Sequence, residues 1–239
     1  MPFKKYKKSD DYSYCLGLTL TFELMLRKKE KAVRIYVHSS INKNDAFNKL
    51  LALCEENGTE VIYSDKPFRI LSDKENVFVI GVFQKFDEAI KIEKDANHLV
   101  LVNPSNAGNI GTILRTALGF GYKNIAIIRP GVDIYDPKAV RASMGAIFSL
   151  NIEYFDSFSD YQAFVGEREM YPFMLQAKIQ MKECKPEGRF SLIFGNEATG
   201  LPEEFINIGV PVIIPITGDI DSLNLPIAAG IAMYHCCDL

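Results

Sequence analysis

Two stretches near the end of the chain each pair a short apolar run with a polar loop. The run SLIF, residues 191–194, is followed by Gly195 and Asn196, which predicts a short buried strand of a parallel sheet. A second run, VPVIIPI, leads into the loop TGDIDSLNLP and then into IAAGIAMYH, where Pro226 favours the first turn of a helix. Loops that follow parallel strands lie at the edge of the sheet where α/β proteins bind ligands. Both loops are therefore candidate ligand contacts.

A third loop of this kind lies between a predicted strand, LVLV, and a predicted helix. The loop NPSNAGNIG contains Gly108 and Gly111, which permit tight backbone paths. The helix has one apolar face, made of Ile110, Ile113, Leu114, Ala117 and Leu118. Arg115 lies off this face, on the side of Gly111, and an arginine so placed can hold a phosphate or carboxylate through two parallel hydrogen bonds. The simpler alternative is an arginine that only faces solvent.

The first 90 residues alternate between helical and strand patterns and predict a small α/β domain. Helices are expected in LGLTLTFELMLRKKEK and DAFNKLLALCEENG, and strands in VRIYVHSS, TEVIYS and VFVIGVFQ. This segment offers no nucleophile with a nearby base, which favours a binding module. Residues 1–14 interleave lysines with tyrosines, a mixture that suits RNA but is more typical of a solvated terminus. The charged residues 84–97 predict a linker, and residues 91–239 a second domain.

Composition narrows the class of protein. At 239 residues and 48% hydrophobic content, the chain is long enough to bury a substantial core. No apolar run approaches the ~20 residues of a membrane span. Five scattered cysteines predict reduced thiols and a cytoplasmic location, and three isolated histidines predict no metal site. The lysine-rich start lacks the apolar core of a signal peptide.

Three motifs in the second half resemble one known family. NPSNAGNIGTILRTALGFG, LIFGNEATGLPEE and IPITGDIDSLNLPIAAGIAMY occur in this order and resemble the three motifs of the SpoU/TrmH family of SPOUT methyltransferases. The similarity covers residues 96–237 closely. The front domain resembles, more loosely, the small RNA-binding domain of many members. The resemblance implies an α/β fold with a parallel sheet and a C-terminal trefoil knot. It also implies a homodimer that transfers a methyl group from S-adenosylmethionine to a ribose 2′-hydroxyl of structured rRNA or tRNA.

The same resemblance assigns roles to individual residues. The catalytic positions of the family fall on Asn109, Arg115, Glu197, Ser222 and Asn224. Its cofactor contacts, largely backbone groups, fall on Gly195, Ile214, Ile216 and Leu223.

The sequence departs from the family pattern at Pro226, where many members have serine. Two other functions are alternatives, and the departure at Pro226 favours only the first of them. One is a non-catalytic RNA-binding or ribosome-associated protein that retains the fold. The other is a nucleotide-dependent oxidoreductase. Its G-x-G-x-x-G fingerprint is missing, because the loop before the helix reads G-N-I-G, and Arg129 stands near the position expected for the acidic ribose ligand.

Overall fold

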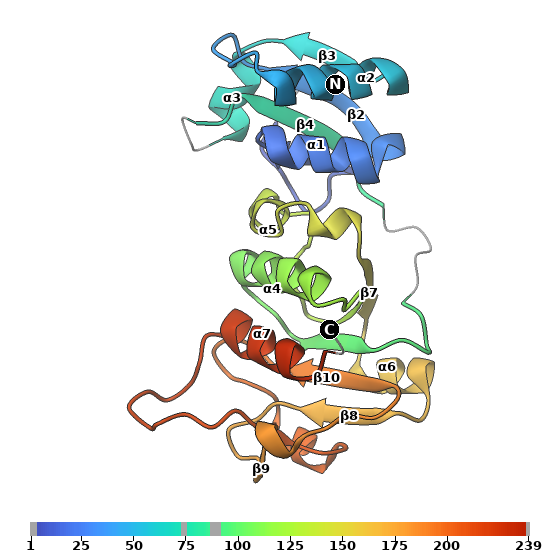
Figure 1. Ribbon diagram of the computed structural model, residues 1–239, viewed down its shortest axis with the longest axis vertical. Helices are drawn as coiled ribbons and strands as arrows, with labels where there is room; N and C mark the ends of the chain where they lie inside the picture. Colours follow the sequence, from blue (N-terminus) through green and yellow to red (C-terminus); the bar gives the residue numbers. More distant parts are fainter. Residues whose placement is uncertain (1–3, 73–75, 87–91, 238–239) are drawn as a thin grey trace. The chain divides into compact units, whose positions relative to one another are not determined.

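The structure, a computed structural model, describes residues 4–72, 76–86 and 92–237 (Figure 1). The chain forms two compact units. One contains Met1–Glu88 and Asp133–Ser149, and the other contains Ala89–Val132 and Leu150–Leu239. The segment Asp133–Ser149 therefore packs with the front of the chain, although the sequence-based division places it in the second domain. Of the expected linker, residues 87–91 lie outside the described part of the chain.

The first unit is built on a four-stranded sheet in the order β1-β4-β2-β3. β2 and β3 are parallel, whereas β4 runs antiparallel to both β1 and β2. The strands are β1 (Tyr12–Leu16), β2 (Ala32–Val37), β3 (Glu60–Tyr63) and β4 (Val79–Gln84), and the helices are α1 (Leu18–Arg27), η1 (Lys29–Lys31), α2 (Asp45–Asn57), α3 (Lys66–Leu71), α5 (Pro137–Ala142) and η2 (Ala146–Phe148). Both helices and all three strands that the sequence predicts in the front segment are confirmed.

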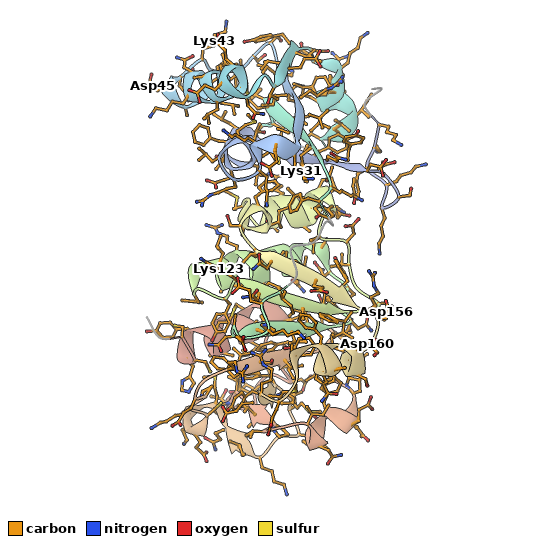
Figure 2. The ribbon with its side chains drawn as sticks, turned by 90° about the vertical axis from the view of Figure 1, so that its right-hand side faces the viewer. Lys31, Lys43, Asp45, Lys123, Asp156 and Asp160 are labelled. Carbon is orange, nitrogen blue, oxygen red and sulfur yellow. The ribbon has the colours of Figure 1, made fainter. Side chains whose placement is uncertain are left out.

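Local chemistry explains where α2 begins and ends. The side chain of Asn44 accepts a hydrogen bond from Phe47 N (3.0 Å) and so satisfies an amide that the helix leaves free. Lys43 and Asp45, on either side of Asn44, are exposed (Figure 2). Gly58 ends the helix with a φ of 68°, a backbone conformation that favours glycine.

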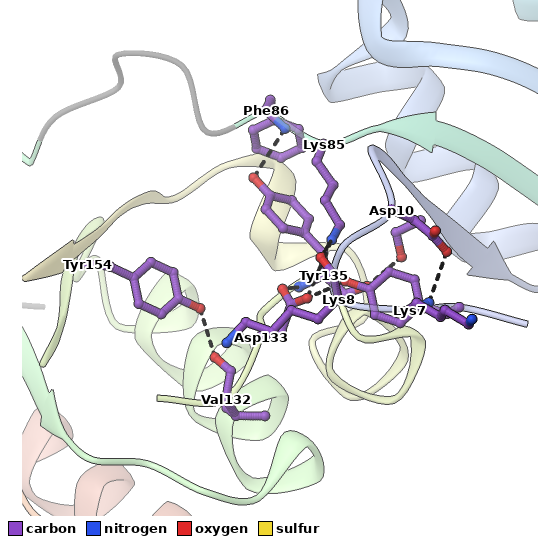
Figure 3. A network of polar contacts seen from close by, with 11 residues as sticks. Lys7, Lys8, Asp10, Lys85, Phe86, Val132, Asp133, Tyr135 and Tyr154 are labelled. Atoms are coloured by element: carbon purple, nitrogen blue, oxygen red, sulfur yellow. Dashed lines mark hydrogen bonds and ion pairs between the residues drawn. The ribbon is translucent and has the colours of Figure 1, made fainter. Parts of the chain in front are cut away.

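The lysine- and tyrosine-rich start of the chain is more ordered than a solvated terminus. Tyr14 lies in β1 and is buried, so its ring is not available to stack on a base. The hydroxyl of Tyr6 donates a hydrogen bond to Asp133, and Lys85 Nζ lies 4.7 Å from the centre of the Tyr6 ring and 3.5 Å from the Asp133 carboxylate. Figure 3 shows this network, in which Tyr135 also receives a hydrogen bond from the Phe86 amide (3.3 Å). These contacts join Asp133–Ser149 to the front of the chain.

The second unit contains a five-stranded sheet in the order β7-β6-β5-β10-β8. All its strand pairs are parallel, as the buried apolar runs predict. Its strands are β5 (His98–Val102), β6 (Asn124–Ile128), β7 (Asn151–Phe155), β8 (Glu169–Pro172) and β10 (Phe190–Phe194), and its helices are α4 (Ala107–Gly119), α6 (Phe158–Val165), η3 (Met181–Glu183), η4 (Glu203–Asn207) and α7 (Leu225–His235). The α/β class with a mainly parallel sheet is therefore confirmed.

Helices enclose this sheet. α7 packs against α4, with the Cβ position of Gly230 3.5 Å from the methyl group of Thr116. α6 contributes Tyr161 and Val165 to a core cluster that includes Val100 of β5. Ser157 and Asp160 form a capping box at the start of α6; Asp160 is labelled in Figure 2. Within the described ranges, no helix combines the length and apolar character needed to cross a membrane.

The two apolar runs near the end of the chain form strands of different length. SLIF is part of β10, and the segment after it contains the short 3₁₀-helix η4. The run VPVIIPI forms only the two-residue strand β11 (Val212–Ile213), which pairs with β9 (Ile179–Gln180). Pro211 and Pro215 flank this strand, and proline has no N–H to donate to a sheet. The rest of the run therefore forms a loop.

Candidate cofactor site

A cavity of about 230 Å³ opens among loops at the carboxyl end of the parallel sheet. Its lining includes all four predicted cofactor contacts, Gly195, Ile214, Ile216 and Leu223, together with Glu197 and Ser222. The ring of Phe173 stacks on that of Phe194, with centroids 4.6 Å apart and planes 11° apart. The cavity thus combines flat apolar surfaces with loop backbone, a combination that suits a small molecule with an aromatic part and polar groups.

Close backbone approach explains why Gly195 follows β10. A Cβ atom at this position would lie 2.1 Å from the carbonyl carbon of Gly200, which is impossibly close. The backbones of Asn196 and Gly200 also exchange two hydrogen bonds. Asn196 N donates to the Gly200 carbonyl (3.1 Å), and Gly200 N donates to the Asn196 carbonyl (2.9 Å). Gly200 adopts a φ of 69° at the end of this turn. The shape of the cavity wall therefore depends on a glycine at position 195.

Glu197 connects this wall to the loop before α4. One carboxylate oxygen accepts from the amide and hydroxyl of Ser105 (3.0 and 2.8 Å), and the other accepts from Asn106 N (3.1 Å) and Asn109 Nδ2 (3.3 Å). Burial opposes ionisation of Glu197, but the hydrogen bonds from Ser105 and Asn106 hold its pKa below the ordinary value. The carboxylate is thus a charged anchor for the start of α4.

The start of α4 is capped from within the same loop. Asn106 Oδ1 accepts from Gly108 N (2.9 Å) and Asn109 N (3.1 Å). Arg115 lies six residues after Asn109, about 9 Å further along the helix axis. Its side chain is exposed, and it is not among the residues that line the cavity. The structure thus brings Asn109 into direct contact with Glu197 and leaves Arg115 open to solvent.

The last motif places its residues at the start of α7. Ser222 and Leu223 line the cavity, whereas Asn224 is exposed and is absent from the lining. The Asn224 carbonyl accepts from Ile227 N (2.9 Å) and Ala228 N (3.0 Å), so its backbone begins the helix. Pro226 lies in the first turn, where its missing N–H costs no hydrogen bond. The departure from the family pattern at this position is therefore compatible with the observed backbone.

Residues 173–176, which also line the cavity, had no role in the sequence-based prediction. They follow the largely buried strand β8. The sequence likewise identifies Asn196 only as a loop residue. Among the residues that the structure describes, no three His, Cys, Asp or Glu side chains gather where they could hold a metal ion.

Comparison with known proteins identifies the family of the chain. A model of the SpoU rRNA Methylase family matches residues 96–234. The chain is 31% identical over 197 residues to the 23S rRNA (adenosine(1067)-2′-O)-methyltransferase of Streptomyces laurentii, which covers 78% of this chain and 72% of that protein.

Two solved structures extend the comparison. The AdoMet-bound rRNA methyltransferase of Sinorhizobium meliloti shares the fold, with a TM-score of 0.78, 24% identity, and coverage of 94% of this chain and 86% of that one. A structure on the 2-OH methylation of C/U34 on tRNA has a TM-score of 0.55 and 29% identity, and covers 59% of this chain and 94% of that one. The family match spans more than half of the chain, and the chain belongs to the SpoU rRNA methylase family.

Proposed function

We propose that this chain transfers the methyl group of S-adenosylmethionine to a ribose 2′-hydroxyl of structured RNA. The observation that carries the proposal is the cavity at the carboxyl end of the sheet, whose lining includes residues of the second and third family motifs. The curated relative with 31% identity is a 2′-O-methyltransferase, which favours catalysis over RNA binding alone. Family membership also argues against a nicotinamide-dependent oxidoreductase.

The residues around the cavity fit the proposed cofactor. Phe173, Phe194 and Leu223 provide apolar surface suited to an adenine ring, and the loops at Gly195 and Ile214 bring backbone groups to the same space. Backbone N–H and C=O groups can bind the polar edges of a nucleoside and an amino acid. When bound, the sulfonium of S-adenosylmethionine supplies a reactive methyl group. The protein has to bind and orient both reactants.

Arg115, Asn109, Ser222 and Asn224 are the residues we propose to act on the RNA. A ribose hydroxyl must pass its proton to an RNA phosphate or to water as it attacks, and it must be aligned with the methyl group, whose bond to sulfur breaks to leave a thioether. The guanidinium of Arg115 is permanently protonated, so it is suited to stabilise the forming alkoxide or to hold a neighbouring phosphate. Amide and hydroxyl groups at Asn109, Ser222 and Asn224 can orient the sugar by hydrogen bonding. Glu197 keeps Asn109 in place.

Ribosomal RNA is the substrate class that the comparisons favour. The alignment with the structure on tRNA methylation includes 94% of that chain but only 59% of this one. That structure therefore has no counterpart for much of the rest of this chain. The rRNA methyltransferase structure aligns with 94% of this chain. We therefore assign the additional front domain, residues 1–90, to recognition of a ribosomal RNA segment.

The same proposal includes a trefoil knot, a homodimer and a cytoplasmic location. β10 lies between β5 and β8, which precede it in sequence, and the chain then returns to pack α7 on α4; this path is compatible with a knot. The outer face of α7 exposes Ile227, Ile231 and Tyr234, an apolar stripe suited to a second copy. All five cysteines are free thiols, as a reducing compartment requires.

The test is to incubate the purified chain with ribosomal RNA and S-adenosylmethionine that carries a deuterated methyl group. Nucleoside mass spectrometry should detect a 2′-O-methylated nucleoside with the corresponding mass increase. Transfer RNA serves as the competing substrate. If label appears only on a base, or on neither RNA, the proposed reaction is wrong.

A further inference from the structure

We infer that Asn196 is a positioning residue that couples the cofactor cavity to the start of α4. This inference rests on the proposed methyl transfer and adds a residue that the family resemblance does not assign. Asn196 is partly buried and lines the cavity. Its side chain reaches from the loop after β10 to the loop after β5, where the helix with Asn109 and Arg115 begins.

The two ends of the Asn196 amide perform different tasks. Oδ1 accepts from Ala198 N (2.9 Å) and Thr199 N (3.3 Å) and so stabilises the turn that forms the cavity wall. Nδ2 donates to the carbonyl of Asn103 (2.8 Å) in the neighbouring loop. Two N–H groups require an oxygen and a carbonyl requires an N–H, so a carboxamide satisfies all three partners where a carboxylate cannot.

Asn103 is itself held in an uncommon conformation. Its φ is 52°, a left-handed value that few residues other than glycine adopt without cost. Its amide donates to the Ile128 carbonyl at the end of β6 (3.0 Å), and its own carbonyl receives Asn196. The loop is therefore tied on both sides at the point where it leaves the sheet.

Asn196 and Glu197 together hold the whole segment between β5 and α4. Asn196 binds it at Asn103, and the adjacent Glu197 binds it at Ser105, Asn106 and Asn109. Both residues lie on the cavity wall, so a bound cofactor that orders this wall also orders the start of α4. The geometry therefore makes the reacting residues on α4 dependent on the state of the cavity.

Asn196→Asp separates the two tasks. The carboxylate still accepts from Ala198 and Thr199 but opposes the Asn103 carbonyl instead of donating to it. We expect cofactor affinity, measured by calorimetry, to change less than about threefold, while kcat for methyl transfer falls on the order of tenfold because α4 is misplaced. Asn196→Ala, which also loses the turn contacts, should weaken both. The matched control is Asn207→Asp, the same chemical change at an exposed position of η4.

Hydrogen exchange gives a readout that does not depend on activity. In Asn196→Asp the amides of residue 103 and of residues 105–109 should exchange several-fold faster than in the parent, and those of β6 should not change. If this variant does not fold, hydrogen exchange of the parent chain provides the test. Adding S-adenosylmethionine to the parent should slow the exchange of the backbone amides in the segment 103–109.

Three results overturn the inference: a parent-like kcat in Asn196→Asp, a loss of cofactor affinity that matches the loss of kcat, or unchanged exchange in 103–109. If the parent chain shows no methyl transfer, the proposed function is wrong. The hydrogen-exchange measurement then still tests whether Asn196 couples the cavity to the start of α4.

Discussion

The two ends of the parallel sheet in the second unit both gather polar residues, but for different purposes. At the carboxyl end, Asn196 and Glu197 lie in loops, are partly buried and line a cavity. At the amino end, His98 of β5 and Ser191 of β10 are fully buried and face the hydroxyl of Tyr161. Polar clustering by itself therefore does not identify a site. An adjacent cavity with accessible polar groups does.

The side chains of His98, Tyr161 and Ser191 at the amino end are joined by hydrogen bonds. His98 Nε2 donates to the Glu93 carbonyl (2.8 Å), which leaves Nδ1 to accept from Arg168 (3.0 Å); Nδ1 also lies 2.8 Å from the Tyr161 hydroxyl. Tyr161 Oη lies 2.6 Å from Ser191 Oγ. Burial, aided by the positive charge of Arg168, lowers the pKa of His98 to about 4. A neutral, buried imidazole with both nitrogens occupied indicates a structural role.

The comparison predicts that changes at the carboxyl end affect catalysis more than stability. The largest effect is expected for Arg115→Ala, which should lower kcat for methyl transfer on the order of 100-fold because the cation proposed to stabilise the forming alkoxide is lost. Since Arg115 is exposed and does not line the cavity, cofactor affinity and the melting temperature should remain close to the parent values. Single-turnover assays with labelled cofactor measure the rate. Arg115→Lys, which keeps the charge but loses the planar fork, should fall in between. Parent-like transfer by Arg115→Ala would show that this residue is not in the reaction.

A smaller effect is expected for Glu197→Gln. In the parent, both carboxylate oxygens accept hydrogen bonds from the loop before α4 and from Asn109. Glutamine replaces one of these oxygens with an N–H₂ group, which cannot accept. The start of α4 should therefore loosen, and kcat should fall about tenfold. Steady-state assays check this, with Glu203→Gln, an exposed glutamate on η4, as the matched control. Equal rates for the two variants would mean that the anchor has no bearing on catalysis.

The sequence predicts the elements better than it predicts their long-range partners. The strands β5 and β10 and the helix α4 follow from local periodicity, and the motifs identify six residues that meet at the cavity. Local pattern does not show that residues 173–176 complete the cavity wall, because the residues that they meet there, Phe194 and Val212, are distant in sequence. For the same reason it does not show that Asp133–Ser149 packs with the first unit through Tyr135 and Phe148.

Protonation of His98, at the amino end, should have the smallest effect on activity but a clear effect on stability. The unfolded chain binds a proton at His98 near the ordinary pKa of about 6.5, whereas the folded chain does so only near 4. The stability contributed by neutral His98 is therefore present at neutral pH and is lost as the pH falls from about 6.5 to about 4. We expect the free energy of unfolding to fall by about 2 kcal/mol between about pH 7 and about pH 5 through this residue alone.

Urea titrations of the parent and of His98→Gln at the two pH values isolate this contribution. The variant starts from a lower stability but lacks the titrating group, so its free energy of unfolding should change less with pH. Identical slopes for the two proteins would show that another group governs the pH dependence.

The most direct test of the account is calorimetric titration of S-adenosylmethionine into the parent chain and into Gly195→Ala. The parent should bind the cofactor, and the variant should lose at least about tenfold in affinity, because its added methyl group has no room beside the Gly200 backbone. Absence of binding to the parent, or equal affinity for the two proteins, would contradict the claim that the loops at the carboxyl end of the sheet form the cofactor site.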